Sequence, residues 1–312
     1  MKAIQQQTST QENVTAIITL AIAIVALSWI AIFFRLLERE IGPFATAFHR
    51  VWLATFLLGI WNGQQGLRGQ FSPEKSAQQQ PYTSWVLIQL FIAGICFAAD
   101  QLLWALSLTK TSVANSTLLT YLNPLWTTLL GWLIWDRHFD KLFLIGMAVA
   151  MVGACMIGIE DLQIATGNLQ GDGVAVLASI GFSIYLLIIE KLREKYSSET
   201  LLFWSSLFST LWILPIVLIT EERIFPDSWQ SWVFIILLGF ICQILGQGLL
   251  NYCLKGLSSG FVAVSLLLSP IMTAIFGWMI FSESLSVLNG VAFAMVLLGI
   301  YLAKSSSSAI KE

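Results

Sequence analysis

Residues 100–135 read DQLLWALSLTKTSVANSTLLTYLNPLWTTLLGWLIW and form the centre of a longer segment, 95–153, that occurs twice in the chain. Moved forward by 146 positions without a gap, this segment aligns with residues 241–299, and 15 of the 59 aligned pairs are identical. Leucine pairs arise easily by chance in an apolar chain. The identities also include less common residue types, at Cys96/Cys242, Gln101/Gln247, Pro124/Pro270 and Trp132/Trp278. We interpret the match as an internal duplication.

The composition indicates a membrane protein. Of the 312 residues, 57% are hydrophobic and 11% are charged, and the mean hydropathy is +0.78. Soluble domains usually carry about 25% charged residues. The apolar runs last roughly 20 residues, enough to cross a hydrocarbon core of about 30 Å. Each run must be helical, because lipid cannot satisfy backbone polar groups. We therefore predict an all-α polytopic membrane protein.

Ten apolar segments define the predicted membrane spans. They lie near residues 14–34, 44–62, 84–108, 113–135, 140–159, 171–190, 201–219, 230–254, 259–281 and 287–303. A polar tail at 1–13 is expected to be disordered, and a short tail follows at 304–312. Between them, one five-helix repeat covers 14–160 and another covers 161–303. Because five is odd, the second repeat enters the membrane inverted, an arrangement typical of secondary transporters.

The basic residues predict the orientation. An even number of spans places both termini on one side, and a cytoplasmic N-terminus puts eleven Lys and Arg residues inside and four outside. The four outside are Arg35, Arg39, Lys110 and Arg223. We expect an integral protein of the bacterial plasma membrane with both termini in the cytoplasm.

Two stretches resemble a known repeat. Residues 111–137 (TSVANSTLLTYLNPLWTTLLGWLIWDR) and 257–286 (LSSGFVAVSLLLSPIMTAIFGWMIFSESLS) are similar to the EamA-type repeat of the drug/metabolite transporter superfamily. Small residues open the helix, a proline lies in its middle, and a glycine precedes a terminal acidic residue. These positions are Pro124, Gly131 and Asp136 in one copy, and Pro270, Gly277 and Glu283 in the other. Residues 42–59 (GPFATAFHRVWLATFLLG) resemble the family's second helix, including its arginine, here Arg50.

This resemblance implies ten helices, cytoplasmic termini, a central cavity and movement of small metabolites, such as amino acids or related compounds, often outward. The first copy departs from the pattern at 136–138 (DRH), where many members have a small residue and Glu. The second copy lacks an arginine equivalent to Arg50. Nucleotide-sugar or sugar-phosphate exchange is an alternative within the superfamily, although that class usually needs more basic residues in its cavity.

Charged residues inside a membrane are costly, which makes them candidates for function. Arg50 and Asp100 both lie roughly 10–12 Å below the predicted outer surface, from a rise of 1.5 Å per residue. One interpretation is a buried ion pair that fixes the helix register. The other is that Arg50 binds a substrate carboxylate through its planar guanidinium. Asp100 is the candidate proton carrier if transport is coupled to protons.

Three amides, Gln243, Gln247 and Asn251, are spaced four residues apart and lie along one helix face. Amides donate and accept hydrogen bonds, so this face suits a cavity for zwitterionic or polar solutes. Hydrogen bonding between helices is the alternative. Trp104 and Tyr185 are candidates for an aromatic wall of the cavity, with ordinary helix packing as the alternative.

Pro124 and Pro270 occupy matching positions in two spans and are predicted to kink them. Asn123, which precedes Pro124, is a further candidate for solute contact. The two copies differ at several polar positions, and we expect substrate contacts there. These positions are Asp100/Gly246, Ala105/Asn251 and Asn123/Ser269.

The chain carries no motif for catalysis, a cofactor or nucleic acid. Walker, HExxH and GxSxG-triad patterns are absent, and the four cysteines lie in apolar runs without metal-ligand spacing. We therefore predict no enzyme activity, cofactor, metal or nucleic-acid partner. The expected partners are a small-molecule substrate and the lipid bilayer, and the chain is expected to be monomeric or homodimeric. A membrane enzyme and a structural or receptor-like membrane protein are the rival classes.

Overall fold

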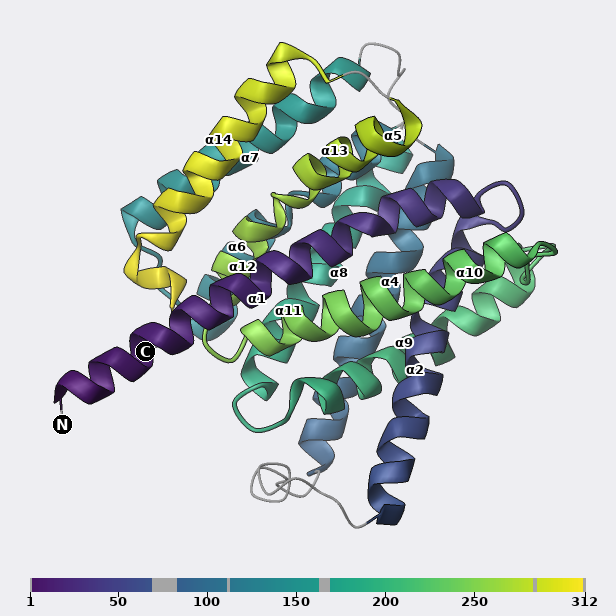
Figure 1. Cartoon of the computed structure of the whole chain (residues 1–312), viewed down its shortest axis with the longest axis horizontal. Helices are drawn as coiled ribbons and strands as arrows, with labels where there is room; N and C mark the ends of the chain where they lie inside the picture. Colours follow the sequence, from purple (N-terminus) through teal and green to yellow (C-terminus); the bar gives the residue numbers. More distant parts are fainter. Residues whose placement is uncertain (1, 69–82, 111–112, 163–168, 283–284, 311–312) are drawn as a thin grey trace.

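The structure is a computed structural model that describes residues 2–68, 83–110, 113–162, 169–282 and 285–310 (Figure 1). The first half contains α1 (Lys2–Leu37), α2 (Pro43–Arg68), α4 (Ser84–Lys110), α5 (Val113–Thr120), α6 (Asn123–Trp135) and α7 (Lys141–Leu162). The second half begins with α8 (Leu169–Leu192) and α9 (Ser198–Thr220). Next come α10 (Trp229–Leu237), η1 (Leu238–Gln247) and α11 (Gly248–Cys253), which follow one another without a break. The half ends with α12 (Ser259–Leu266), α13 (Ser269–Phe281) and α14 (Val287–Lys304).

These helices confirm the predicted all-α membrane fold. Among the described residues, eight helical segments are long and apolar enough to cross a membrane. The shorter apolar helix Lys141–Ile157 and the interrupted pair α5–α6 supply the remaining two spans. Many large apolar side chains on the outside of the bundle are exposed, among them Trp132, Leu133 and Ile134. Exposed apolar surface of this kind marks contact with a membrane or another protein, and together with the long apolar helices it makes the chain an integral membrane protein.

The duplication is visible in the positions of the helices. The pair α5–α6 and the pair α12–α13 begin and end at residues that are 146 positions apart, the same offset as in the sequence. Both second helices end on a residue in the left-handed backbone region, Asp136 with φ 51° and Ser282 with φ 57°. Non-glycine residues rarely adopt this conformation. Its recurrence at equivalent positions supports the two inverted five-helix repeats.

The proline positions differ from the expected kink within a continuous helix. Each span is interrupted one turn earlier, and Pro124 and Pro270 lie in the first turn of the helix that follows. A missing N–H costs nothing there, because the first turn of a helix has no internal acceptors for its amides. Each interruption forms a hydrogen bond with a serine of the other repeat. Ser28 of α1 meets Ser269 (Oγ–Oγ 3.0 Å), and Ser183 of α8 donates to the carbonyl of Asn123 (3.0 Å).

The N-terminal segment also differs from the prediction. Residues 1–13 were expected to form a disordered tail, but α1 begins at Lys2 and runs without interruption to Leu37. The apolar part of this helix starts at Val14. The polar residues before it therefore extend the helix beyond the membrane-spanning segment.

The two repeats are interlocked. Helix α1 of the first repeat packs against η1 and α13 of the second, and α8 of the second packs against α4 and α6 of the first. The last helices of the repeats, α7 (teal) and α14 (yellow), lie side by side along one edge of the bundle (Figure 1). The interface between the two repeats is therefore formed by helices from both.

Glycines allow the close approach of α7 and α14. A Cβ added at Gly299 would lie 2.4 Å from the Ala150 nitrogen and 2.5 Å from the Gly146 oxygen. We predict that Gly299→Val lowers the free energy of unfolding in detergent by about 2 kcal/mol. The nearest atoms that the new side chain would meet belong to the backbone of α7, which cannot move aside as a flexible side chain can. The control is Gly290→Val on the same helix, where a Cβ meets nothing within 4 Å. Equal melting temperatures for the two variants would contradict this packing.

Candidate functional site

A set of polar side chains meets where the two repeats join. We call it the central polar cluster. Its members are Arg50 of α2, Asp100 and Gln101 of α4, Tyr185 of α8, Ser206 of α9, Gln243 and Gln247 of η1, and Asn251 of α11. All are buried except Asp100, which is partly exposed. Buried polar groups in a membrane protein are retained for hydrogen bonding or function, so this cluster is the candidate site.

Gln101 connects the two embedded charges. The Nη1 group of Arg50 donates to Gln101 Oε1 (3.0 Å), and Gln101 Nε2 donates to Asp100 Oδ2 (3.0 Å). The amide thus presents its acceptor to the cation and its donor to the anion. Among the described residues, Arg50 and Asp100 meet through this amide rather than as a direct ion pair.

Tyr185 organises the second network. Its hydroxyl donates to Asn251 Oδ1 (3.0 Å) and accepts from Gln247 Nε2 (3.4 Å). The third amide, Gln243, turns toward α9 and donates to Ser206 Oγ (3.1 Å). The three amides therefore share one buried face, with two partners from neighbouring helices.

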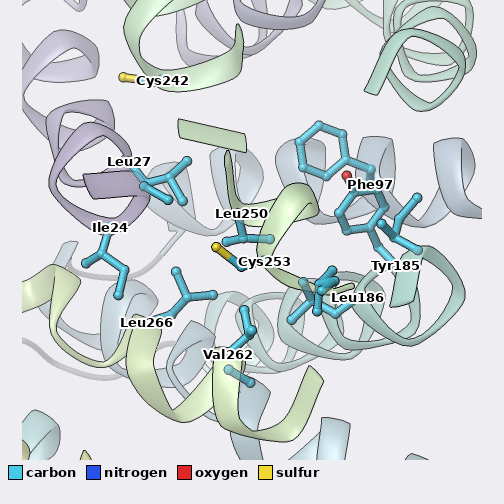
Figure 2. Packing of buried hydrophobic residues seen from close by; sticks show 14 of the residues in the cluster. Ile24, Leu27, Phe97, Tyr185, Leu186, Cys242, Leu250, Cys253, Val262 and Leu266 are labelled. Carbon is cyan, nitrogen blue, oxygen red and sulfur yellow. The ribbon is translucent and has the colours of Figure 1, made fainter. Parts of the chain in front are cut away.

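Phe97 links the two networks. Its ring centroid lies 4.8 Å from that of Tyr185, and the two side chains are adjacent in Figure 2. The guanidinium carbon of Arg50 lies 5.6 Å from the centroid of the Phe97 ring. A cation over an aromatic face is attracted by the ring quadrupole. Arg50 therefore has an aromatic neighbour as well as its amide partner.

The helix that carries two of the amides has an unusual backbone. Residues Leu238–Gln247 form a π-helix, whereas the equivalent part of α4 is a regular α-helix. π-Helical turns are rare and frequently occur at functional sites. The wider turn belongs to the second repeat alone, so it makes the site asymmetric.

Several buried polar atoms of the cluster have no hydrogen-bond partner in the described part of the chain. They are Arg50 Nε, Gln243 Oε1 and Asn251 Nδ2. An unpaired buried polar group costs about 1–3 kcal/mol. A small solute that both donates and accepts hydrogen bonds would recover this free energy.

The remaining candidates lie beside the cluster or apart from it. Trp104 is one turn beyond Asp100 on α4, is partly exposed, and contacts the Phe34 ring edge-on at 4.9 Å between centroids. Asn123 is buried at the start of α6, and its backbone carbonyl accepts from Ser183. Its side-chain Oδ1 has no hydrogen-bond partner in the described part of the chain, so no hydrogen bond from this atom connects Asn123 with the other candidates.

The site candidates predicted from the sequence do not include Gln101. The signal was present, because Gln101 and Gln247 are an identical pair in the duplication. Both lie in the central polar cluster, one bonded to Arg50 and the other to Tyr185. We had expected substrate contacts where the copies differ. The equivalent glutamines show that identical positions also reach the centre.

Reciprocal contacts join the repeats at the end of the bundle that holds the α1–α2 and α9–α10 loops. Glu221 accepts from the first free amide of α2, that of Phe44 (3.0 Å). Glu40 accepts from Ser228 through its hydroxyl and its amide (3.0 Å), next to the start of α10. These hydrogen bonds, chiefly that from the Ser228 hydroxyl, hold the pKa of Glu40 below its usual value. Each acidic residue thus caps a helix of the other repeat.

The opposite end is closed by different residues. Arg137, which follows α6, pairs with the buried Glu190 of α8 and lies 3.4 Å from Ser259 Oγ of α12. Asp140 accepts from the Phe143 amide (2.7 Å), which holds its pKa below the usual value, with a further bond from Ser306 (2.7 Å). Contacts between the repeats therefore occur at both ends of the bundle.

Two inverted five-helix repeats that enclose a buried polar centre define a membrane transporter. The chain belongs to the EamA-like transporter family, whose model matches residues 14–159 and 169–304.

Several known proteins are similar to this chain in sequence or in fold. A protein of Archaeoglobus fulgidus described as an uncharacterized transporter is 24% identical over 91% of this chain and 96% of its own length. The GDP-mannose transporter GONST5 of Arabidopsis thaliana is 21% identical over 68% of this chain and 63% of its own. A solved crystal structure superposes with a TM-score of 0.76 at 16% identity, covering 94% of this chain and 98% of that one. This last likeness shows the fold alone.

Proposed function

We propose that this protein is a secondary transporter, an exporter or facilitator, of small polar metabolites such as amino acids or related compounds. The solute binds at the central polar cluster and passes by alternating access between the two repeats. The observation that carries the proposal is the convergence of helices from both repeats on buried polar side chains, three of which keep an atom without a hydrogen-bond partner in the described part of the chain.

Alternating access is supported by the contacts at the two ends. Glu40 and Glu221 join the repeats at one end, and Arg137 joins them at the other. Opening a path requires that one set of contacts separates while the other stays closed. Inverted repeats suit this movement, because the same rearrangement serves both sides.

We also propose the placement of the protein. The excess of basic residues in the loops on one side favours a plasma-membrane protein with cytoplasmic termini. The repeats would then cover 14–160 and 161–303, with polar segments 1–13 and 304–312 at the cytoplasmic face. The proposal holds for a monomer and for a homodimer.

Nucleotide-sugar exchange is the second candidate, because GONST5 is named as a GDP-mannose transporter. A diphosphate carries more than one negative charge. Among the described members of the central polar cluster, Arg50 is the sole cation. Arg193 is also buried, but it donates to the backbone carbonyls of Asn251 (3.1 Å) and Tyr196 (2.8 Å). The charges therefore favour a solute with a single anionic group.

A flux screen in proteoliposomes tests the proposal. The purified protein is reconstituted, and the movement of labelled amino acids, sugars, nucleotide sugars and nucleobases is compared with that in protein-free vesicles. We expect saturable movement of at least one amino acid or related compound. Movement of nucleotide sugars alone would favour the second candidate. No movement of any class would favour a structural or enzymatic role.

A further inference from the structure

The contacts of Gln101 resemble those of a bound zwitterion. Its amide oxygen accepts from the cation of Arg50, as a carboxylate would (3.0 Å). Its amide nitrogen donates to the anion of Asp100, as an ammonium group would (3.0 Å). One planar group thus satisfies a cation and an anion at the same time. In an α-amino acid, a carboxylate and an ammonium group are similarly close together.

The Gln101 amide does not satisfy every hydrogen-bond donor of Arg50. Arg50 is 3% exposed, yet its Nε has no hydrogen-bond partner in the described part of the chain. The amide oxygen of Gln101 occupies Nη1 alone. A carboxylate has two oxygens and can accept from two groups of one guanidinium, with the added strength of a charge-assisted bond. A solute carboxylate therefore fits Arg50 better than the amide does.

Access to this pair is also suitable. Asp100 is the partly exposed member of the central polar cluster, and it lies next to Gln101 in the chain. Gln101 itself is 5% exposed. A long, unbranched side chain can rotate away from its partners without movement of the backbone. A solute can thus replace the Gln101 amide as the hydrogen-bond partner of Arg50 and Asp100.

Resting on the transport function proposed above, we propose that Gln101 is an internal competitor that occupies the Arg50–Asp100 pair and selects zwitterionic α-amino compounds. The solute carboxylate replaces the amide oxygen on Arg50, and the solute ammonium replaces the amide nitrogen on Asp100. Only a solute that carries both groups restores both contacts. Gln101 is a specificity-determining residue, whereas Arg50 and Asp100 are the groups that touch the solute.

Removal of an internal competitor and removal of a binding residue have opposite effects. We expect Gln101→Ala to lower the Kd of amino acids about tenfold, near the low end of what hydrogen bonds to charged groups contribute. Gln101→Glu places a permanent carboxylate on Arg50 and should raise the Kd at least about tenfold. Gln230→Ala, at an exposed glutamine of α10, is the matched control and should leave the Kd unchanged.

The measurement is equilibrium binding of labelled L-alanine, L-leucine and L-phenylalanine to the full-length protein in detergent. Melting temperatures measured alongside show that each variant is folded. A raised or unchanged Kd in folded Gln101→Ala would overturn the proposal. So would binding in folded Gln101→Glu that is as tight as in the unmodified protein.

The unmodified protein offers a test that needs no variant. Each amino acid is compared with its carboxamide, which lacks the carboxylate, and with its des-amino acid, which lacks the ammonium group. We expect both analogues to bind at least about tenfold more weakly, because each loses one contact to a charged group. An analogue that binds as tightly as the amino acid overturns the zwitterion inference. If another solute class moves in the flux screen while no amino acid binds, this inference fails and the transport function stands.

Discussion

Replacement of Arg50 by leucine is expected to reduce solute flux about 100-fold. The guanidinium is buried, donates to Gln101 at 3.0 Å and lies over the Phe97 ring. Hydrogen bonds to a charged group contribute about 1.5–3 kcal/mol each, and every 1.4 kcal/mol is about a tenfold change in affinity. Loss of the guanidinium removes at least one such bond to the solute and its long-range attraction. Initial rates of uptake into proteoliposomes, at equal amounts of reconstituted protein, measure the effect.

Two further variants separate charge from geometry. Arg50→Lys keeps the charge and loses the planar arrangement of donors, so an intermediate loss of about tenfold is expected. Arg223→Leu is the control, because Arg223 forms an exposed pair with Asp227 (2.8 Å) that contributes little. Full activity in Arg50→Leu, or an equal loss in Arg223→Leu, would remove Arg50 from the proposed site.

Removal of Arg137 is expected to destabilise the protein by about 3–5 kcal/mol. Its partner Glu190 has a side chain with 0% exposure, whereas the Arg137 side chain is 28% exposed. Arg137→Ala removes the guanidinium that pairs with this buried carboxylate, and the loss of one partner from a buried pair typically costs this much. Thermal and denaturant unfolding in detergent measures the change.

The double variant gives the sharper result. Arg137→Ala combined with Glu190→Leu removes both charges, so we expect it to be more stable than Arg137→Ala alone. The matched comparison is Arg223→Ala, alone and with Asp227→Leu, where the exposed pair should change stability by about 0–1 kcal/mol. A double variant less stable than Arg137→Ala would show that the pair is not the main interaction of Glu190.

Most of the fold could be predicted from the sequence, because membrane spans depend on a simple physical rule. Runs such as 84–108 and 287–303 had to be helical in lipid, and the helices Ser84–Lys110 and Val287–Lys304 match them closely. The offset between the two copies predicted equivalent helices, and α5–α6 and α12–α13 keep it. The basic residues predicted an orientation, which stays a prediction.

Other features depend on contacts that a sequence does not display. The interruption before Pro124 is held by Ser183, which is distant in the chain. The π-helical stretch Leu238–Gln247 follows no pattern of residue types that we could interpret. The helix in the first thirteen residues was hidden by their polar composition, because that composition also suits a disordered tail.

The residue types of the site could be predicted from the sequence, whereas the hydrogen bonds between these residues could not. Arg50, Asp100, Tyr185 and the three amides stood out because polar groups are rare in such spans. Their matched depth makes a buried pair of Arg50 and Asp100 one interpretation of the sequence, and the structure places the Gln101 amide between them. Asn123 looked equally promising by type, yet its side-chain oxygen has no hydrogen-bond partner in the described part of the chain. Whether a polar residue joins the central polar cluster depends on which helix faces lie against one another.

The central claim is that solute crosses the membrane at the central polar cluster by alternating access. Counterflow tests it most directly: proteoliposomes are loaded with an unlabelled amino acid, and uptake of the same labelled compound is followed over time. The account predicts a transient accumulation of label with the unmodified protein, and none with Arg50→Leu. Equal accumulation with both proteins, or none with the unmodified protein for any solute that the flux screen identifies, would contradict it.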